Sequence, residues 1–291
     1  MEKSLIYSLL ELAHSTSQNL GFAHRKDVHL SYGEETITET NLLELRRRHP
    51  SIISLRTFTK KKESLNGSDW EWHVIGRGRT LRMRVQAKRL QKNDKLKISH
   101  TVASTGKQQI DLLITDAKTY GLKPVYCFFT SEEQRSAWKK QSNLISGTFE
   151  EFEYGCLLAC AHDVKHTMPT TLAAIEPHTV PWHFLVAKHR FFQRAFNWPP
   201  VDATIMHFIG NQLQIFAELK SEPVPITKYK FPTLSELNSA EKPRTTYEGV
   251  IEADAPDYEL KMSEHAYEER GISKVIKFDV RDFESPDAAT D

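Results

Sequence analysis

The spacing of hydrophobic residues predicts two helices at the start of the chain. Leucines recur at helical intervals in residues 2–15, which gives this segment one apolar face. A second helix is predicted over residues 34–48, where leucines again form a stripe, three arginines occupy the last turn and His49-Pro50 follows as a stop. Both helices therefore have an apolar face that can pack against a core.

A strand-rich block follows these helices. Residues 52–58 are rich in β-branched and aromatic side chains, and residues 69–75 and 81–88 alternate apolar with polar side chains. The glycines of residues 76–78 supply a turn between the two alternating runs. The two runs are therefore predicted to pair as a β-hairpin.

The block ends in another helix and another strand. Residues 107–120 have helical spacing and stop at Gly121, and residues 125–129 form an apolar strand. The predicted order of helix, three strands, helix and strand indicates an α/β fold. We expect residues 1–146 to form this core together with the N-terminal helix, and residues 147–291 to form an appended α+β accessory region of unknown role.

The second half of the chain gives weaker signals. Residues 149–165 have helical spacing, and residues 204–218 are apolar without a period that separates helix from strand. Residues 231–257 contain three prolines among polar residues and are predicted to be irregular. Residues 272–280 are predicted to form a closing strand.

Composition narrows the class of protein. The chain has 291 residues, of which 39% are hydrophobic and 26% charged, so collagen-like and wholly disordered classes are excluded. No stretch approaches the roughly 18 consecutive apolar residues of a membrane span, so no membrane partner is expected. Three cysteines cannot form a disulfide framework, and an odd number suits a reducing compartment. We therefore expect a cytoplasmic protein.

Two sets of side chains invite other functions. One group of cysteines and histidines could bind zinc, because i and i+4 positions share a helix face, but apolar packing of the cysteines is favoured. That group comprises Cys156, Cys160, His162 and His166. The tryptophans Trp70, Trp72, Trp182 and Trp198 could stack on bases, but packing in the core is favoured for them as well.

Charge is distributed unevenly along the chain although the net charge is only +1. Residues 44–107 contain 17 Lys and Arg against 5 Asp and Glu, whereas residues 241–291 contain 7 against 14. A basic stretch of this density suits a polyanionic partner such as nucleic acid, the alternative being a solvated face. One hypothesis is that the acidic segment masks the basic surface until a trigger displaces it.

The predicted hairpin brings together residues that can hold a metal ion. Residues two apart in a strand share a face, so Asp69 and Glu71 on one strand are expected to face Gln86 and Lys88 on the other. Carboxylate and amide oxygens, together with the carbonyl of Ala87, are ligands that suit Mg²⁺ or Mn²⁺. Lys88 would position a water molecule and stabilise charge developing on a phosphate.

This arrangement resembles the PD-(D/E)xK nuclease superfamily, which has the restriction-endonuclease-like fold. That family has an αβββαβ core with a mixed central sheet, an acid on the second strand and (D/E)xK on the third. The matching residues here are Asp69 and Gln86-Ala87-Lys88, with Gln replacing the usual acid, and the resemblance covers roughly residues 30–130. It implies a Mg²⁺-dependent endonuclease that hydrolyses DNA, similar to bacterial proteins of antiviral defence.

The resemblance also implies further site residues. A glutamate in the first core helix is expected to join the site, for which Glu35 is preferred and Glu34 and Glu39 are alternates. With one negative charge fewer at Gln86, the metal site is expected to depend on Glu35 and Glu71 as ligands. Contacts to nucleic acid are expected from Gln109, Arg84, Arg89, Lys60, Lys61 and Lys62.

Two other functions remain open. The same fold can bind nucleic acid without cleaving it, a change that Gln86 would make easier. The chain can also be an interaction subunit of a multi-protein defence system, with a companion protein or a second copy of itself as partner.

Overall fold

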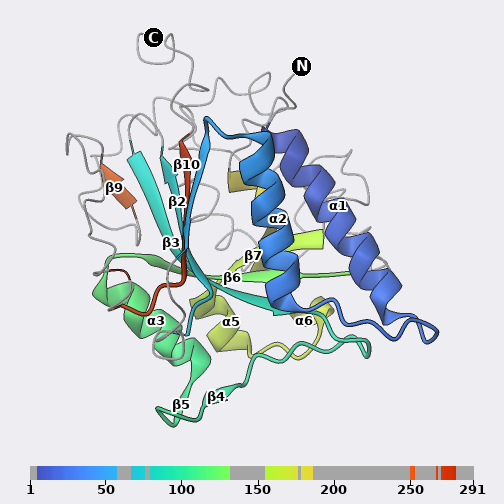
Figure 1. Ribbon diagram of the computed structural model, residues 1–291. Helices are drawn as coiled ribbons and strands as arrows, with labels where there is room; N and C mark the ends of the chain where they lie inside the picture. Colours follow the sequence, from blue (N-terminus) through green and yellow to red (C-terminus); the bar gives the residue numbers. More distant parts are fainter. Residues whose placement is uncertain are drawn as a thin grey trace, which may run out of the picture.

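The protein has a mixed α/β fold built on one large sheet (Figure 1). Among the described residues, eight strands join this sheet in the order β1-β10-β2-β3-β6-β7-β8, and β9 pairs with β3. The predicted α/β class is therefore confirmed. The structure is a computed structural model that describes residues 5–57, 67–75, 79–131, 155–175, 178–185, 250–252, 267 and 270–279.

Most elements of the first half lie where the hydrophobic pattern predicts them. The helix α2 spans the predicted range, whereas α1 continues nine residues beyond the predicted end at residue 15. The helices are α1 (Leu5–His24), α2 (Glu34–Arg48), α3 (Gln109–Thr119), α5 (Ala161–Thr167), α6 (Leu172–Ile175) and the 3₁₀ helix η5 (Trp182–Leu185). The strands of the large sheet are β1 (Ile53–Thr57), β2 (Trp70–Ile75), β3 (Arg79–Arg89), β6 (Lys123–Phe129), β7 (Cys156–Cys160), β8 (Thr179–Pro181), β9 (Val250–Glu252) and β10 (Lys274–Asp279). Strands β4 (Thr101–Val102) and β5 (Lys107–Gln108) form a separate antiparallel pair.

The sheet is covered on both faces. Alternate side chains of β6 show this, because they pack in two different hydrophobic clusters. Cys127 and Phe129 pack in the hydrophobic cluster that contains α1 and α2, whereas Tyr126 and Phe128 pack in the cluster that contains α3 and α5. Figure 1 shows these two helix pairs on opposite sides of the strands. The central strand β6 is therefore apolar on both faces, as expected for a buried strand.

Strands β2 and β3 pair antiparallel, so the predicted hairpin pairing is confirmed. Their apolar side chains, among them Trp72 and Met83, pack on the α1 and α2 side. Trp70, Trp72 and Trp182 are buried there, so the packing interpretation of these tryptophans is confirmed. The opposite faces of β2 and β3 carry buried polar side chains, and on β3 these face α3.

The prediction of a helix over residues 149–165 is wrong for its central part. Residues 156–160 form β7, which pairs antiparallel with both β6 and β8. A five-residue apolar run has no period of its own, so the free edge of β6 decides its conformation. Cys156 and Cys160 are therefore four strand residues apart, about 13 Å at the usual strand rise, which does not fit the zinc pair considered above.

Strands from the second half of the chain complete the same sheet. The predicted closing strand is confirmed as β10, which lies between β1 and β2. β9 is a short strand inside the segment that was predicted to be irregular. The described parts of residues 1–146 and 147–291 thus share one sheet. Lys60–Lys62, the turn at residues 76–78, Trp198 and residues 204–218 lie outside the described residues.

Candidate functional site

The candidate site lies where β3 runs past the beginning of β2. Trp70, the first residue of β2, is paired with Val85, so residues 86–89 of β3 extend beyond this pairing. The amide of Asp69 still donates to the carbonyl of Val85, at 2.8 Å. Beyond that point, this edge of β3 has main-chain groups without a partner in β2.

Two carboxylates bind the edge of β3 that β2 leaves unpaired. The amide of Ala87 donates to Oδ2 of Asp69 at 2.6 Å, and the amide of Arg89 donates to Oε1 of Glu34 at 3.0 Å. Residues two apart in a strand are separated by about 6.6 Å, so the two carboxylates lie side by side along this edge. The site thus gains two negative charges at the end of β3.

A chain of four side chains runs from Lys88 to Asp69. Nζ of Lys88 donates to Oε1 of Gln109 at 2.9 Å, and Nε2 of Gln109 donates to Oε1 of Gln86 at 2.7 Å. Nε2 of Gln86 then donates to Oδ2 of Asp69 at 2.7 Å and to the carbonyl of Ala87 at 2.9 Å. An ammonium only donates and a carboxylate only accepts, so the two ends of the chain determine how both amides are oriented.

The fold explains why these side chains meet. Gln86 and Lys88 alternate with Val85 and Ala87 on β3, so they point to the α3 face, where Lys88 is only 9% exposed. Gln109 is the first residue of α3. The start of this helix therefore lies over the end of β3, and the sequence-based placement of Gln109 beside the site is consistent with this geometry.

Gly67 is a site residue that the sequence reasoning missed. Its φ is +70°, a conformation that glycine adopts without strain, and a Cβ at this position would collide with the carbonyl of Gln109. The turn before Asp69 is thus in direct contact with the first turn of α3. The available signal was a glycine two residues before the predicted acid.

Glu71 lies in a separate, buried cluster of charges. Its Oε1 contacts Nε2 of His73 at 2.6 Å and a guanidinium nitrogen of Arg82 at 3.5 Å. Its Oε2 contacts Arg84 at 3.3 Å and Arg270 at 3.1 Å. Both oxygens therefore already have partners, which does not fit the predicted role of Glu71 as a metal ligand beside Asp69.

Electrostatics explain how this cluster tolerates burial. Burial acts to raise the pKa of Glu71, but the hydrogen bond from His73 and the charges of Arg84 and Arg270 lower it to about 2. Burial lowers the pKa of His73 below its ordinary value of 6.5, although Glu71 opposes this effect. At neutral pH, Glu71 is therefore ionised and His73 is neutral.

Arg84 belongs to this cluster and not to a surface. Its side chain has no exposed area, and it pairs with Asp116 of α3 at 2.6 Å as well as with Glu71. The prediction that Arg84 contacts nucleic acid is therefore wrong for this arrangement. Alternation placed it correctly on the face of Gln86 and Lys88, but only the position of α3 shows that this part of the face is covered.

Among the three candidate helix acids, Glu34 binds the main chain of β3 through the amide of Arg89. Glu35 is exposed, and Glu39 pairs with Lys274 of β10 at 3.4 Å. Helical spacing alone could not choose between neighbours on α2, because the choice depends on how the helix axis lies over β3. We therefore replace the predicted Glu35 with Glu34 in the candidate site.

The oxygens at the end of β3 suit a hard divalent cation. Mg²⁺ in proteins is commonly held by one or two carboxylates and keeps several waters, so a large acidic cluster is not required. Within the described residues, no group of three or more His, Cys, Asp or Glu side chains forms such a cluster. The Asp69 carboxylate and the Ala87 carbonyl nevertheless converge, because both accept hydrogen bonds from one amide nitrogen of Gln86.

The predicted role of Gln86 needs a correction. Its oxygen accepts a hydrogen bond from Gln109, and its nitrogen points to the oxygens of Asp69 and Ala87. In this orientation Gln86 is a donor and not an oxygen ligand. The residues that fit a cation are thus Asp69, the carbonyl of Ala87 and Glu34.

Comparison with known proteins gives a family without a known activity. The chain matches a family of unknown function (DUF6615) over residues 5–282, a range that includes the candidate site and every described strand. No curated protein matches the chain. None of the described helices is long and apolar enough to cross a bilayer.

Proposed function

The chain belongs to the DUF6615 family, and from the chemistry of its site we propose that it is a metal-dependent nuclease that hydrolyses phosphodiester bonds in DNA. The observation that carries the proposal is the hydrogen-bonded chain Lys88, Gln109, Gln86 and Asp69. This chain joins the ammonium of Lys88 to the carboxylate of Asp69, beside the converging oxygens at the end of β3. The sequence motif predicted such a grouping for phosphoryl chemistry.

Each member of the site has a distinct proposed role. Asp69, the Ala87 carbonyl and Glu34 would hold Mg²⁺ or Mn²⁺, which when bound would lower the pKa of a water and stabilise charge on the phosphate. Lys88 places an ammonium where negative charge develops on the reacting phosphate. Gln109 and Gln86 are positioning residues, because they orient Lys88 and Asp69 through hydrogen bonds.

The order of elements supports a restriction-endonuclease-like core. Helix α2 is followed by β1, β2, β3, α3 and β6, with short β4 and β5 before α3. β2 and β3 are antiparallel, and β3 and β6 are parallel, which makes the central sheet mixed. The position of β10 between β1 and β2 would be an addition to that core.

A second candidate is a DNA-binding module that does not cleave. It is favoured by the orientation of Gln86, whose NH₂ group points at the oxygens of Asp69 and Ala87 that would otherwise face a cation. In this alternative the polar chain is a structural relic of a catalytic site, and binding needs no metal.

Incubation with DNA separates the two candidates. Purified full-length protein is incubated with linear and circular DNA, with Mg²⁺, Mn²⁺ or a chelator, and products are resolved on gels. The nuclease proposal predicts metal-dependent cleavage that Lys88→Ala reduces at least about 100-fold, the scale of a lost transition-state contact. Lys97→Ala, a change at an exposed lysine of the neighbouring segment, is the matched control and should leave cleavage unchanged.

The alternative results are equally informative. Metal-independent binding without products would favour the binding module over the nuclease. Cleavage that survives in Lys88→Ala would contradict the role of Lys88. The resemblance implies a role in antiviral defence, so we propose foreign DNA as the substrate. A companion defence protein is included in a second reaction if the chain alone shows no cleavage.

A further inference from the structure

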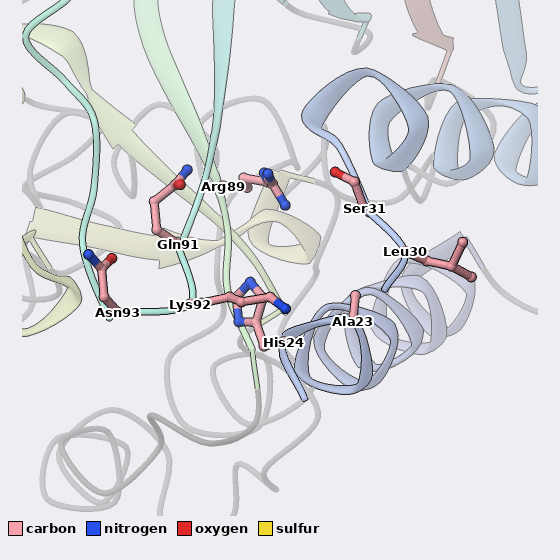
Figure 2. A pocket seen from close by; sticks show the side chains of 8 residues that line it. All are labelled: Ala23, His24, Leu30, Ser31, Arg89, Gln91, Lys92 and Asn93. Atoms are coloured by element: carbon pink, nitrogen blue, oxygen red, sulfur yellow. The ribbon is translucent and has the colours of Figure 1, made fainter. Parts of the chain in front are cut away.

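The end of β3 leads directly into a pocket of about 410 Å³ (Figure 2). One wall comes from the last turn of α1 and the loop that follows, including His24 and Ser31. The other wall is formed by Arg89, the last residue of β3, and by residues 91–93. Arg89 follows Lys88 in the strand, so the pocket adjoins the candidate site.

The pocket lining carries positive charges that form no ion pair with a described carboxylate. Its described lining contains the two cations Arg89 and Lys92 and no acidic side chain. A guanidinium nitrogen of Arg89 donates to the carbonyl of Tyr32 at 3.1 Å, and Nζ of Lys92 contacts the carbonyl of Arg25 at 3.5 Å. Carbonyl contacts position a cation without cancelling its charge. Within the described chain, neither cation forms an ion pair, so both can attract an anion.

The remaining lining suits a nucleotide and not a simple ion. Gln91, Asn93 and Ser31 offer hydrogen-bond donors and acceptors, and Leu30, which is 78% exposed, adds an apolar surface at the rim. The volume falls in the usual range for small-ligand pockets, about 300–1,000 Å³, and is too small for a duplex. The site therefore suits one unit of a nucleic-acid strand.

The position of the pocket relates it to the proposed cleavage. The side chain of Lys88 points to the α3 face of β3, and by alternation that of Arg89 points to the other face, toward α2. The carboxylates of Asp69 and Glu34 lie at the strand edge between them. A DNA strand that crosses the end of β3 would meet the acids and the pocket in succession.

The geometry points to this pocket as a subsite for one nucleotide of a single DNA strand, next to the phosphodiester that is cleaved, with its phosphate held by Arg89 and Lys92. This inference rests on the proposed function, because it takes DNA as the substrate. It adds a defined binding site on the α2 side of the sheet. It also requires that the bound DNA is single-stranded at that point.

Binding without cleavage tests the subsite. Fluorescence anisotropy with a short single-stranded DNA is measured in chelator, so that no product forms. Lys92→Ala is expected to weaken binding about 5- to 10-fold and to reduce the salt slope of log K by about 0.7, the value for one lost phosphate contact on a single strand. Lys97→Ala, which removes an exposed lysine outside the pocket lining, should change affinity less than twofold.

A second probe locates the phosphate. A series of oligonucleotides is used in which each member has one neutral methylphosphonate at a different linkage. One member should bind the unmodified protein more weakly than the others. This difference should disappear with Lys92→Ala. Equal effects of Lys92→Ala and Lys97→Ala, or the same linkage profile in both proteins, would overturn the subsite.

The result is separable from the nuclease test. Cleavage by the unmodified protein with no effect of Lys92→Ala on binding would reject the subsite and leave the nuclease proposal standing. A selective loss of binding in Lys92→Ala, without cleavage under any condition, would support the subsite in a non-cleaving DNA-binding protein.

Discussion

At the scale of the residue, Gln86 decides the charge balance at the end of β3. Its amide nitrogen lies between two oxygens, Oδ2 of Asp69 and the carbonyl of Ala87, while its oxygen faces Gln109. A carboxylate at this position would lie against Asp69 and would have no N–H group to donate to it. The neutral amide therefore stabilises the site when no cation is bound, and it reduces the negative charge available to hold one.

Gln86→Glu is predicted to make folding depend on the metal. Two carboxylates at about 4 Å repel each other by at most about 4 kcal/mol at an effective dielectric of 20, so the melting temperature should fall in chelator. Added Mg²⁺ should restore it, and calorimetry should show Mg²⁺ affinity raised by about 10- to 100-fold over the unmodified protein. The control is Gln108→Glu, because the side chain of Gln108 bonds Thr101 and not Asp69. The same metal affinity in both variants would contradict a cation site at Asp69.

At the scale of the element, the site forms where two helices begin over the end of one strand. α2 begins with Glu34 and α3 begins with Gln109, and both residues bind groups of β3 or its side chains. The periodicity of the sequence predicted these helices and the hairpin. It could not predict β7, because a short apolar run takes its conformation from the strand edge beside it.

Gly67→Ala tests how α3 is joined to the turn before Asp69. The left-handed φ and the collision of a Cβ with Gln109 require the backbone to shift, so we expect unfolding free energy to fall by well over 1 kcal/mol in urea titrations. Gly106→Ala is a matched control, because its φ is +66° but nothing lies within 4 Å of the added Cβ. That control should cost only about 1 kcal/mol. Equal losses in the two variants would show that the contact with α3 is unimportant.

At the scale of the whole molecule, the second half of the chain is part of the central sheet. β10 pairs with β1 on one side and with β2 on the other, and Arg270, just before it, contacts Glu71. A truncation that removes the acidic C-terminal segment, which is hypothesised to mask the basic surface, would also remove β10. Charge-neutralising substitutions are the suitable test.

Truncation is instead predicted to abolish folding. Deletion from residue 274 onward removes β10 and exposes edges of β1 and β2, which should yield aggregated protein or protein without cooperative thermal unfolding. Deletion of residues 283–291 keeps β10 and the whole family match, and it should unfold cooperatively. A soluble, cooperatively folded product from the longer deletion would contradict the central position of β10.

The buried charge cluster predicts how stability depends on pH. His73 has a folded pKa below 6.5, so the unfolded chain binds its proton first and stability falls as pH drops through about 6.5. Glu71 has a folded pKa of about 2 against an ordinary 4.5, so its contribution is present above 4.5 and is lost as pH falls toward 2. Urea midpoints measured from pH 8 to pH 3 should show both losses.

His73→Gln isolates the first of these losses. Glutamine keeps a donor for Glu71 but does not titrate, so the fall in stability between pH 7 and pH 5 should become shallower. The loss below pH 4.5 should remain. A pH profile identical to that of the unmodified protein would show that His73 does not control the first loss.

The sequence by itself determined the α/β class, the hairpin and the grouping of Asp69, Gln86 and Lys88, because these follow from local periodicity and the alternation of side chains along a strand. Only the tertiary structure decided which polar residues of that face stay near the surface and which are buried. The position of α3 encloses Glu71 and Arg84 in a charge cluster and brings Gln109 to Lys88. The orientation of α2 brings Glu34 to the main chain of β3, because contacts between elements distant in sequence depend on packing that no local pattern encodes.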